Sequence, residues 1–257
     1  MKFIFFDIDG TLVYNKCGKE IIPESTIRTI EKLKEKGHVV AVATGRSLAT
    51  VLPVAAKLGI HHIVSDGGNG LVIADEIKYI NPLDKEFVEV LTKELIAKKI
   101  PFAYMSDPIK RKIKASPLML AYQNIHSFED FTIEVSEDYD YLNEKAYKIF
   151  VNIKSGEEEC VQTINLKEVM RYHDDCLAIE PEDKYKGMKE LVNYFQGDEK
   201  DIVFFGDGYN DRSVVLQAPL SIAMGNAVDA LKDISSFVTK DILDDGIEYA
   251  CQHFKLI

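Results

Sequence analysis

The sequence predicts an α/β fold in which a doubly wound parallel sheet is interrupted by a second, α+β unit. Two observations indicate this. At both ends of the chain, short continuous apolar runs alternate with amphipathic helical segments, and this pattern gives a parallel sheet with right-handed crossovers. In the middle, helical stretches mix with strands that alternate or carry charge. We therefore expect residues 1–82 and 182–257 to form the core and residues 83–181 to form an inserted unit.

The first third of the chain is expected to contain three strands and two helices. The strands are expected at 3–6, 39–43 and 63–64, and the helices at 23–36 and 47–58. Ser25 or Thr26 can cap the first helix, and Gly37 suits the position just after its end. Gly59 ends the second helix in the same way. This order of elements extends a parallel sheet.

The remaining elements follow from the same periodicities. Apolar residues at 188, 191, 192 and 195 line one face of a helix that Gly197 closes. Strands are expected at 202–205 and 220–223, and a last helix is expected near 247–254. In the inserted unit, a helix is expected at 85–98 and strands at 101–105 and 146–153.

Size and composition exclude several classes of protein. The 257 residues suit one large domain or two smaller ones, and the 46% apolar content argues against a disordered chain. A net charge of −11 argues against a general nucleic-acid binder. The apolar run at 3–6 is too short for a signal peptide, and no run approaches the roughly 18 residues of a membrane span. With four widely spaced cysteines, we expect a cytoplasmic protein, monomeric or homodimeric, that binds neither nucleic acid nor a membrane.

Polar residues follow four of the predicted strands, at the point where each strand ends. They are Asp7 with Asp9, Thr44, Asp66, and Asp207 with Asp211. Ligands of open α/β sheets bind outside the carboxyl ends of the strands, so these side chains are expected to share one site. Unrelated turns would not be expected to fall at one edge.

The composition of this edge predicts a magnesium and phosphate site. Asp7 and Asp9 are two residues apart, so they can point the same way, and a nearby cation would relieve their repulsion. Oxygen ligands suit Mg²⁺, while Thr44 and glycine-flanked N–H groups such as that of Gly45 can bind phosphate oxygens. A lysine is also needed to offset the charge. Lys184 and Lys186 both lie just before the predicted helix, and the residues alone leave the choice open.

Four motifs in order resemble the haloacid dehalogenase-like phosphohydrolases, and among them the Cof-like sugar-phosphatase branch. Residues 7–11 (DIDGT) resemble the first motif, D-x-D-G-T, and Thr44 in residues 43–46 (ATGR) resembles the second. Lys186, in the K-G pair of residues 185–187 (YKG), fits the third. Residues 206–211 (GDGYND) fit the fourth, G-D-x-x-N-D, and residues 224–227 (MGNA) and 245–246 (DG) also resemble that branch. The match spans the chain from Met1.

Two segments depart from the pattern of the branch. Residues 212–214 (RSV) replace a more apolar run, and residues 68–71 (GNGL) stand where N-G-A is expected. Neither departure touches the residues of the chemistry. Both weaken any transfer of a substrate's identity from relatives.

The resemblance implies a Rossmann-like core with an inserted α+β cap and assigns roles to the motif residues. Asp7 would be the nucleophile that forms an aspartyl-phosphate, and Asp9 would act first as acid and then as base. The phosphate-binding groups would be Thr44, Gly45, Lys186 and Asn210. Magnesium would be held by Asp7, the backbone carbonyl of Asp9, and Asp207, with Asp211 holding the metal's water shell.

The function expected from this is Mg²⁺-dependent hydrolysis of a small phosphorylated metabolite, such as a sugar phosphate or a phosphorylated cofactor. A phosphomutase or phosphotransferase with the same intermediate, or a phosphate-binding regulator without turnover, remain alternatives. A response-regulator receiver is much shorter and lacks the D-x-D spacing.

Substrate choice would lie in the cap, and the sequence offers only candidates for it. They are Tyr104, Met105, Lys110, Arg111 and Lys112, which stand out because they include a basic run in an acidic chain. A solvated face is the competing interpretation of that run. Arg46 can either contact a substrate or face solvent.

Overall fold

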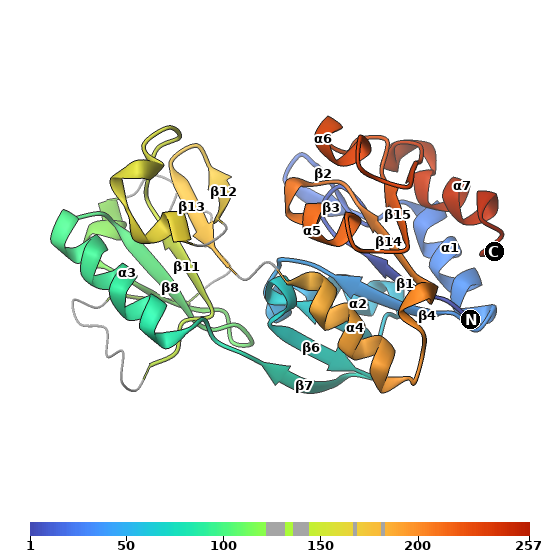
Figure 1. Ribbon diagram of the computed structural model, residues 1–257, viewed down its shortest axis with the longest axis horizontal. Helices are drawn as coiled ribbons and strands as arrows, with labels where there is room; N and C mark the ends of the chain where they lie inside the picture. Colours follow the sequence, from blue (N-terminus) through green and yellow to red (C-terminus); the bar gives the residue numbers. More distant parts are fainter. Residues whose placement is uncertain (122–131, 136–143, 167–168, 181–182) are drawn as a thin grey trace. The chain divides into compact units, whose positions relative to one another are not determined.

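Two units divide the chain in the computed structural model, which describes residues 1–121, 132–135, 144–166, 169–180 and 183–257 (Figure 1). Unit 1 comprises Met1–Arg46, Thr50–Tyr79 and Glu182–Ile257, and unit 2 comprises Ser47–Ala49 and Ile80–Pro181. The expected boundary at 181–182 lies outside the described residues.

Unit 1 is built on an eight-stranded sheet in the order β16-β15-β14-β1-β4-β5-β6-β7. Its strands are β1 (Phe3–Phe6), β4 (Val39–Ala43), β5 (His62–Ser65), β6 (Gly70–Ile73), β7 (Glu76–Ile80), β14 (Ile202–Gly206), β15 (Leu220–Ala223) and β16 (Phe237–Val238). From β16 to β5 every pair is parallel, whereas β6 runs antiparallel to β5. The predicted sheet is thus confirmed, with an antiparallel edge that the apolar runs did not indicate.

The antiparallel edge follows from the short connection between β5 and β6. Only the 3₁₀ turn η1 (Asp66–Gly68) and Asn69 separate the two strands. A parallel crossover needs a dozen or more residues, so a connection this short returns the chain antiparallel. A second hairpin, β2 (Tyr14–Lys16) and β3 (Lys19–Ile21), follows the loop after β1 and was also not predicted.

Helices cover both faces of the unit 1 sheet. They are α1 (Glu24–Glu35), α2 (Leu48–Leu58), α4 (Lys184–Tyr194), α5 (Arg212–Val215), α6 (Asp229–Lys232) and α7 (Gly246–His253). Phe5 of β1 packs in one core cluster with Met188 of α4. Side chains alternate along a strand, so the fully buried Ile4 and Phe6 point to the other face, and α1 contacts β4 and α7.

The expected cap of α1 is wrong. The helix begins at Glu24 after Pro23, and no side chain caps it. Ser25 and Thr26 lie inside the first turn and are buried. Pro23 lies just before the helix in extended backbone (φ −59°, ψ 141°), so the helix starts directly after it and leaves Ser25 and Thr26 no cap position to occupy.

The described residues of unit 2 pair a six-stranded sheet, in the order β10-β9-β8-β11-β13-β12, with a long helix. Its elements include α3 (Lys85–Lys98), β8 (Phe102–Asp107), β9 (Lys112–Ala115), β10 (Thr132–Val135), β11 (Lys148–Val151), β12 (Val169–His173) and β13 (Cys176–Ile179). The β9–β10 pair is parallel, and the other pairs are antiparallel.

Two of the predicted cap candidates are wrong, because Tyr104 and Met105 are core residues, 1% and 2% exposed. Lys110 and Lys112 are exposed, and Arg111 is half-buried.

Within the described parts of the chain, no helix is long and apolar enough to cross a membrane. The four cysteines, Cys17, Cys160, Cys176 and Cys251, are free thiols.

Candidate active site

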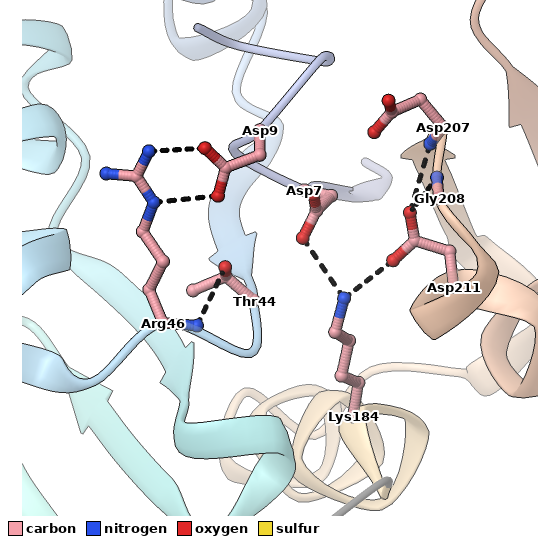
Figure 2. Close-up of polar contacts among 8 residues, drawn as sticks. All are labelled: Asp7, Asp9, Thr44, Arg46, Lys184, Asp207, Gly208 and Asp211. Atoms are coloured by element: carbon pink, nitrogen blue, oxygen red, sulfur yellow. Dashed lines mark hydrogen bonds and ion pairs between the residues drawn. The ribbon is translucent and has the colours of Figure 1, made fainter. Parts of the chain in front are cut away.

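The polar residues predicted at the strand ends meet at one edge of the unit 1 sheet. Asp7 directly follows β1, Thr44 follows β4, and Asp207 follows β14. These three strands are neighbours in parallel register, with Phe6 of β1 opposite both Val42 and Phe205. Their carboxyl ends therefore carry the three side chains into the same place, as Figure 2 shows.

Lys184 is the cation at the centre of this group. Its Nζ lies 3.1 Å from Asp7 Oδ1 and 2.6 Å from Asp211 Oδ1, and all three side chains are buried (Figure 2). Burial acts to lower the pKa of Lys184, but Asp211 and Asp7 together raise it above its usual value. Lys184 is therefore a fixed positive charge between two carboxylates.

The predicted lysine, Lys186, is not at this position. Its side chain is exposed, and its backbone N–H donates to Asp183 Oδ1 at 3.3 Å. Successive helical residues turn by about 100°, so residues two apart face nearly opposite sides, and only one of the two lysines can face Asp7. The signal that identifies Lys184 was present in the sequence, because it continues the stripe of Met188 and Leu191 at helical spacing.

Glycines bring the start of α4 close to the sheet. Asp183 N donates to Gly67 O at 2.7 Å, and Gly68, with a φ of +106°, has no room for a Cβ beside the Asp183 carbonyl. A Cβ at Gly187 would lie 2.6 Å from Val64 Cγ1. The K-G pair of the motif is thus explained by the glycine, which lets α4 approach β5.

Asp211 links the fourth motif to Lys184. It ends the turn η7 (Tyr209–Asp211), and its Oδ2 accepts from the N–H groups of Asp207 (3.0 Å) and Gly208 (3.2 Å). One oxygen therefore holds the loop after β14, and the other holds Lys184. Asn210 lies half-buried with its Oδ1 folded back over Gly208.

The loop after β1 fits closely against Asp207. Gly10 has a φ of +72°, and a Cβ there would collide with the Asp207 carboxylate. Asn226 Nδ2 donates to Gly10 O at 2.8 Å, while its Oδ1 accepts from Ile242 N at 3.0 Å. Asn226 thus ties the D-x-D-G loop to a distant segment, a contact that the motif alone does not reveal.

Three carboxylates of the site fit a divalent cation. Asp7, Asp207 and Asp211 each offer an oxygen, and these atoms all lie within 4.8 Å of one another. Burial, Asp211 and Asp9 raise the pKa of Asp207 to about 7, and burial and Asp211 raise that of Asp7 well above its usual range against the opposing effect of Lys184. One lysine does not balance three acids, so an all-oxygen cluster with unbalanced negative charge suits a hard ion such as Mg²⁺. The Asp9 carboxylate is not in this cluster.

Asp9 is paired with Arg46 instead. Arg46 Nε donates to Asp9 Oδ2 at 2.8 Å and Nη2 donates to Oδ1 (Figure 2). Nη2 also lies 2.6 Å from Glu20 Oε1. Arg46 therefore does not simply face solvent but is paired with two carboxylates.

The remaining predicted residues surround this group. Thr44 is buried, and its Oγ1 accepts from Arg46 N at 3.2 Å. Gly45 is buried between them. Asp66 is buried after β5, where its Oδ2 accepts from Ser65 Oγ and its N–H donates to Arg46 O. Asp66 therefore links the turn after β5 to the backbone of Arg46.

Comparisons with known proteins agree with the geometry. The haloacid dehalogenase-like hydrolase family matches residues 4–250. YkrA of Bacillus subtilis (strain 168), named as a phosphatase, is 33% identical over 100% of this chain and 98% of its own length. YwtE of the same organism, named as a 5-amino-6-(5-phospho-D-ribitylamino)uracil phosphatase, is 26% identical over 97% of this chain and 96% of its own.

Solved structures show the same fold along the whole chain. A protein from Geobacillus kaustophilus HTA426 superposes with a TM-score of 0.84 at 31% identity, covering 100% of this chain and 99% of that one. The sugar phosphatase BT4131, of HAD subclass IIB, gives a TM-score of 0.82 at 26% identity, covering 100% of both chains. With its motifs gathered at one sheet edge and these matches over its length, the chain belongs to the haloacid dehalogenase-like hydrolases, as a phosphatase of their Cof-like branch.

Proposed function

We propose that the protein is a Mg²⁺-dependent phosphatase that hydrolyses small phosphate monoesters through an aspartyl-phosphate on Asp7. The observation that carries the proposal is the cluster of Asp7, Asp207 and Asp211, in which Lys184 pairs with Asp7 and Asp211, with Asp9 two residues beyond the nucleophile. A carboxylate nucleophile, a lysine and an acid–base group are the parts that such a reaction needs.

In the first step, a carboxylate oxygen of Asp7 forms a bond to phosphorus and the ester P–O bond breaks. The proton of the Asp9 carboxyl passes to the leaving oxygen, which departs as an alcohol. In the second step, a water oxygen bonds to phosphorus, and the bond from phosphorus to Asp7 breaks. Asp9 takes the water proton, so inorganic phosphate leaves and both carboxyl groups return to their starting states.

Other groups of the site hold charge and orientation. Lys184 opposes the effect of burial on Asp7, which favours the ionised form that a nucleophile requires. We assign Lys184, in place of Lys186, to the phosphoryl oxygens, together with Thr44, Gly45 N–H and Asn210. Magnesium, held by Asp7, the Asp9 carbonyl, Asp207 and the water shell at Asp211, would supply the charge that lets one anion attack another.

The substrate class proposed is a small phosphorylated metabolite. One solved structure is named as a sugar phosphatase and one relative as a 5-amino-6-(5-phospho-D-ribitylamino)uracil phosphatase, which supports sugar phosphates and phosphorylated cofactors as the compounds to test. We assign substrate choice to unit 2 as the cap. Exclusion of water by the cap would favour transfer to a sugar hydroxyl, so a phosphomutase is the second candidate.

Phosphate release across a panel of sugar phosphates and phosphorylated cofactors tests the proposal, with Mg²⁺ and with a chelator. We expect turnover of several esters with Mg²⁺ and none with the chelator. Activity that the chelator leaves intact would contradict the metal, and phosphate appearing on an added sugar rather than free in solution would favour the mutase.

A further inference from the structure

The guanidinium of Arg46 joins carboxylates from two separate segments. Asp9 lies in the loop after β1, and Glu20 lies on β3 of the hairpin that follows it. Nε and Nη2 donate hydrogen bonds to the two carboxylate oxygens of Asp9, and Nη2 also pairs with Glu20 Oε1. This fork contact with Asp9 has the planar geometry that arginine provides and lysine does not.

Asp9 needs such a contact because it is the most accessible acid of the site. Its side chain is 67% exposed, whereas those of Asp7 and Asp211 are 4% and 0% exposed. An exposed carboxylate on a loop rotates about its side-chain bonds, and proton transfer requires a fixed distance to the reacting oxygen. Two parallel hydrogen bonds fix both the position and the plane of the carboxylate.

Arg46 is itself held at both ends. Its backbone N–H donates to Thr44 Oγ1 at 3.2 Å, and its backbone oxygen accepts from Asp66 N at 2.9 Å. Its side chain is only 19% exposed. Glu20 Oε1 lies 2.6 Å from Nη2, the same nitrogen that donates to Asp9 Oδ1. The fork is therefore attached to the same loops that carry the phosphate-binding and nucleophilic residues.

We propose that Arg46 is a positioning residue for the acid–base group Asp9, and that Glu20 keeps the Arg46 guanidinium aligned for this role. The inference rests on the proposed function, because alignment matters only if Asp9 transfers protons. Two hydrogen bonds from one planar guanidinium hold the Asp9 carboxylate in a single orientation.

The leaving group separates this role from a general structural one. An alkyl alcohol leaves poorly without a proton, whereas 4-nitrophenolate needs little help. We expect Arg46→Met to lower kcat/KM for glycerol 2-phosphate about 100-fold, and to lower that for 4-nitrophenyl phosphate less than about 10-fold. Arg46→Lys should change the ratio of the two values in the same direction, since it keeps the charge but not the fork. Glu20→Gln should change this ratio in the same direction by about 3-fold to 10-fold.

Arg28→Met is the matched control. Arg28 also lies near two carboxylates, 4.0 Å from Glu24 and 3.9 Å from Glu248, but on the exposed side of α1. Arg28→Met removes the same positive charge as Arg46→Met. It should leave the ratio of kcat/KM for the two esters at the wild-type value. Equal losses on both esters in the Arg46 and Glu20 variants, or a gain on the alkyl ester, would overturn the inference alone. A wild-type chain that hydrolyses neither ester would overturn the proposed function and the inference together.

Discussion

The two units surround their carboxylates in opposite ways. In unit 1, Asp7 and Asp211 share Lys184, an Asp207 oxygen lies within 4.8 Å of theirs, and burial with mutual repulsion raises the pKa of Asp7 and Asp207. In unit 2, a single acid, Glu94 of α3, is surrounded by donors. Its oxygens accept from Lys98, from Gln162 N and from both the N–H and the hydroxyl of Thr163.

The difference distinguishes a site that needs a ligand from one that is complete. Burial acts to raise the pKa of Glu94, but the hydrogen bonds from Lys98 and Thr163 lower it to about 2. The four donors satisfy this carboxylate, and it ties the turn η5 (Thr163–Leu166) to α3. The acids of unit 1 keep unbalanced charge, which a cation and a phosphoryl group can use. Excess charge thus indicates function, and satisfied charge indicates structure.

The largest effect is expected from replacing the nucleophile, Asp7. Asp7→Asn should lower turnover at least about 1,000-fold, because an amide cannot form the aspartyl-phosphate. The fold should be kept, since the amide has the same shape. Kinetics with a sugar phosphate measure the turnover, and the circular dichroism spectrum tests whether the fold is kept. A folded variant that retains more than a few percent of activity would remove Asp7 as the nucleophile.

Lys184→Met tests whether the buried acids depend on one cation. We expect a loss of turnover of about 100-fold or more, and a lower stability by about 3 to 5 kcal/mol, because Asp7 and Asp211 would lose their buried partner. Lys186→Met is the matched control, two residues away and exposed, and should change both quantities little. Denaturant unfolding and steady-state kinetics of the two variants give the answer, and the opposite ranking would return the role to Lys186.

Asp207→Asn tests the Mg²⁺ site that we propose from the unbalanced negative charge of the three carboxylates. The substitution keeps the fit against Gly10 but removes one negative ligand, so the Mg²⁺ concentration for half-maximal activity should rise about 100-fold or more. A magnesium titration of the wild type and the variant measures it. Superimposable titration curves would contradict the proposed metal site.

The smallest effect is expected in unit 2. Glu94→Gln should destabilise the protein by about 1 to 2 kcal/mol at neutral pH and leave turnover unchanged, since the amide keeps the shape but loses charged acceptors. The folded pKa of about 2 lies below the usual 4.5, so this contribution is present above about pH 4.5 and is lost as the pH falls toward 2.

Glu89→Gln serves as the control for that measurement. Glu89 pairs with Lys93 on the exposed side of the same helix, so its removal should leave stability nearly unchanged. Unfolding curves at several pH values compare the variants. A difference between Glu94→Gln and wild type that does not shrink in acid would show that the hydrogen-bonded charge is not its cause.

Several elements were predictable because their signals are local. Strands 39–43 and 220–223 and helix 85–98 were predicted with the bounds that the structure gives to β4, β15 and α3. Each has an apolar period bounded by polar residues or glycine. Strands β2, β3 and β7 were missed, because β2 and β3 have only three residues each and all three carry exposed charged residues.

By itself, the sequence determined where the chemical groups would gather. Apolar runs that end in Asp7, Thr44 and Asp207 must place these residues at one edge of a parallel sheet, because the direction of the strands is shared. Only the tertiary structure decided which groups touch. Whether Lys184 or Lys186 meets Asp7 depends on the rotation of α4 against the sheet, and the packing of Gly187 on Val64 sets that rotation. The pairing of Asp9 with Arg46 and Glu20 likewise depends on loops that meet only after the strands have paired, since each contact joins segments that no local pattern connects.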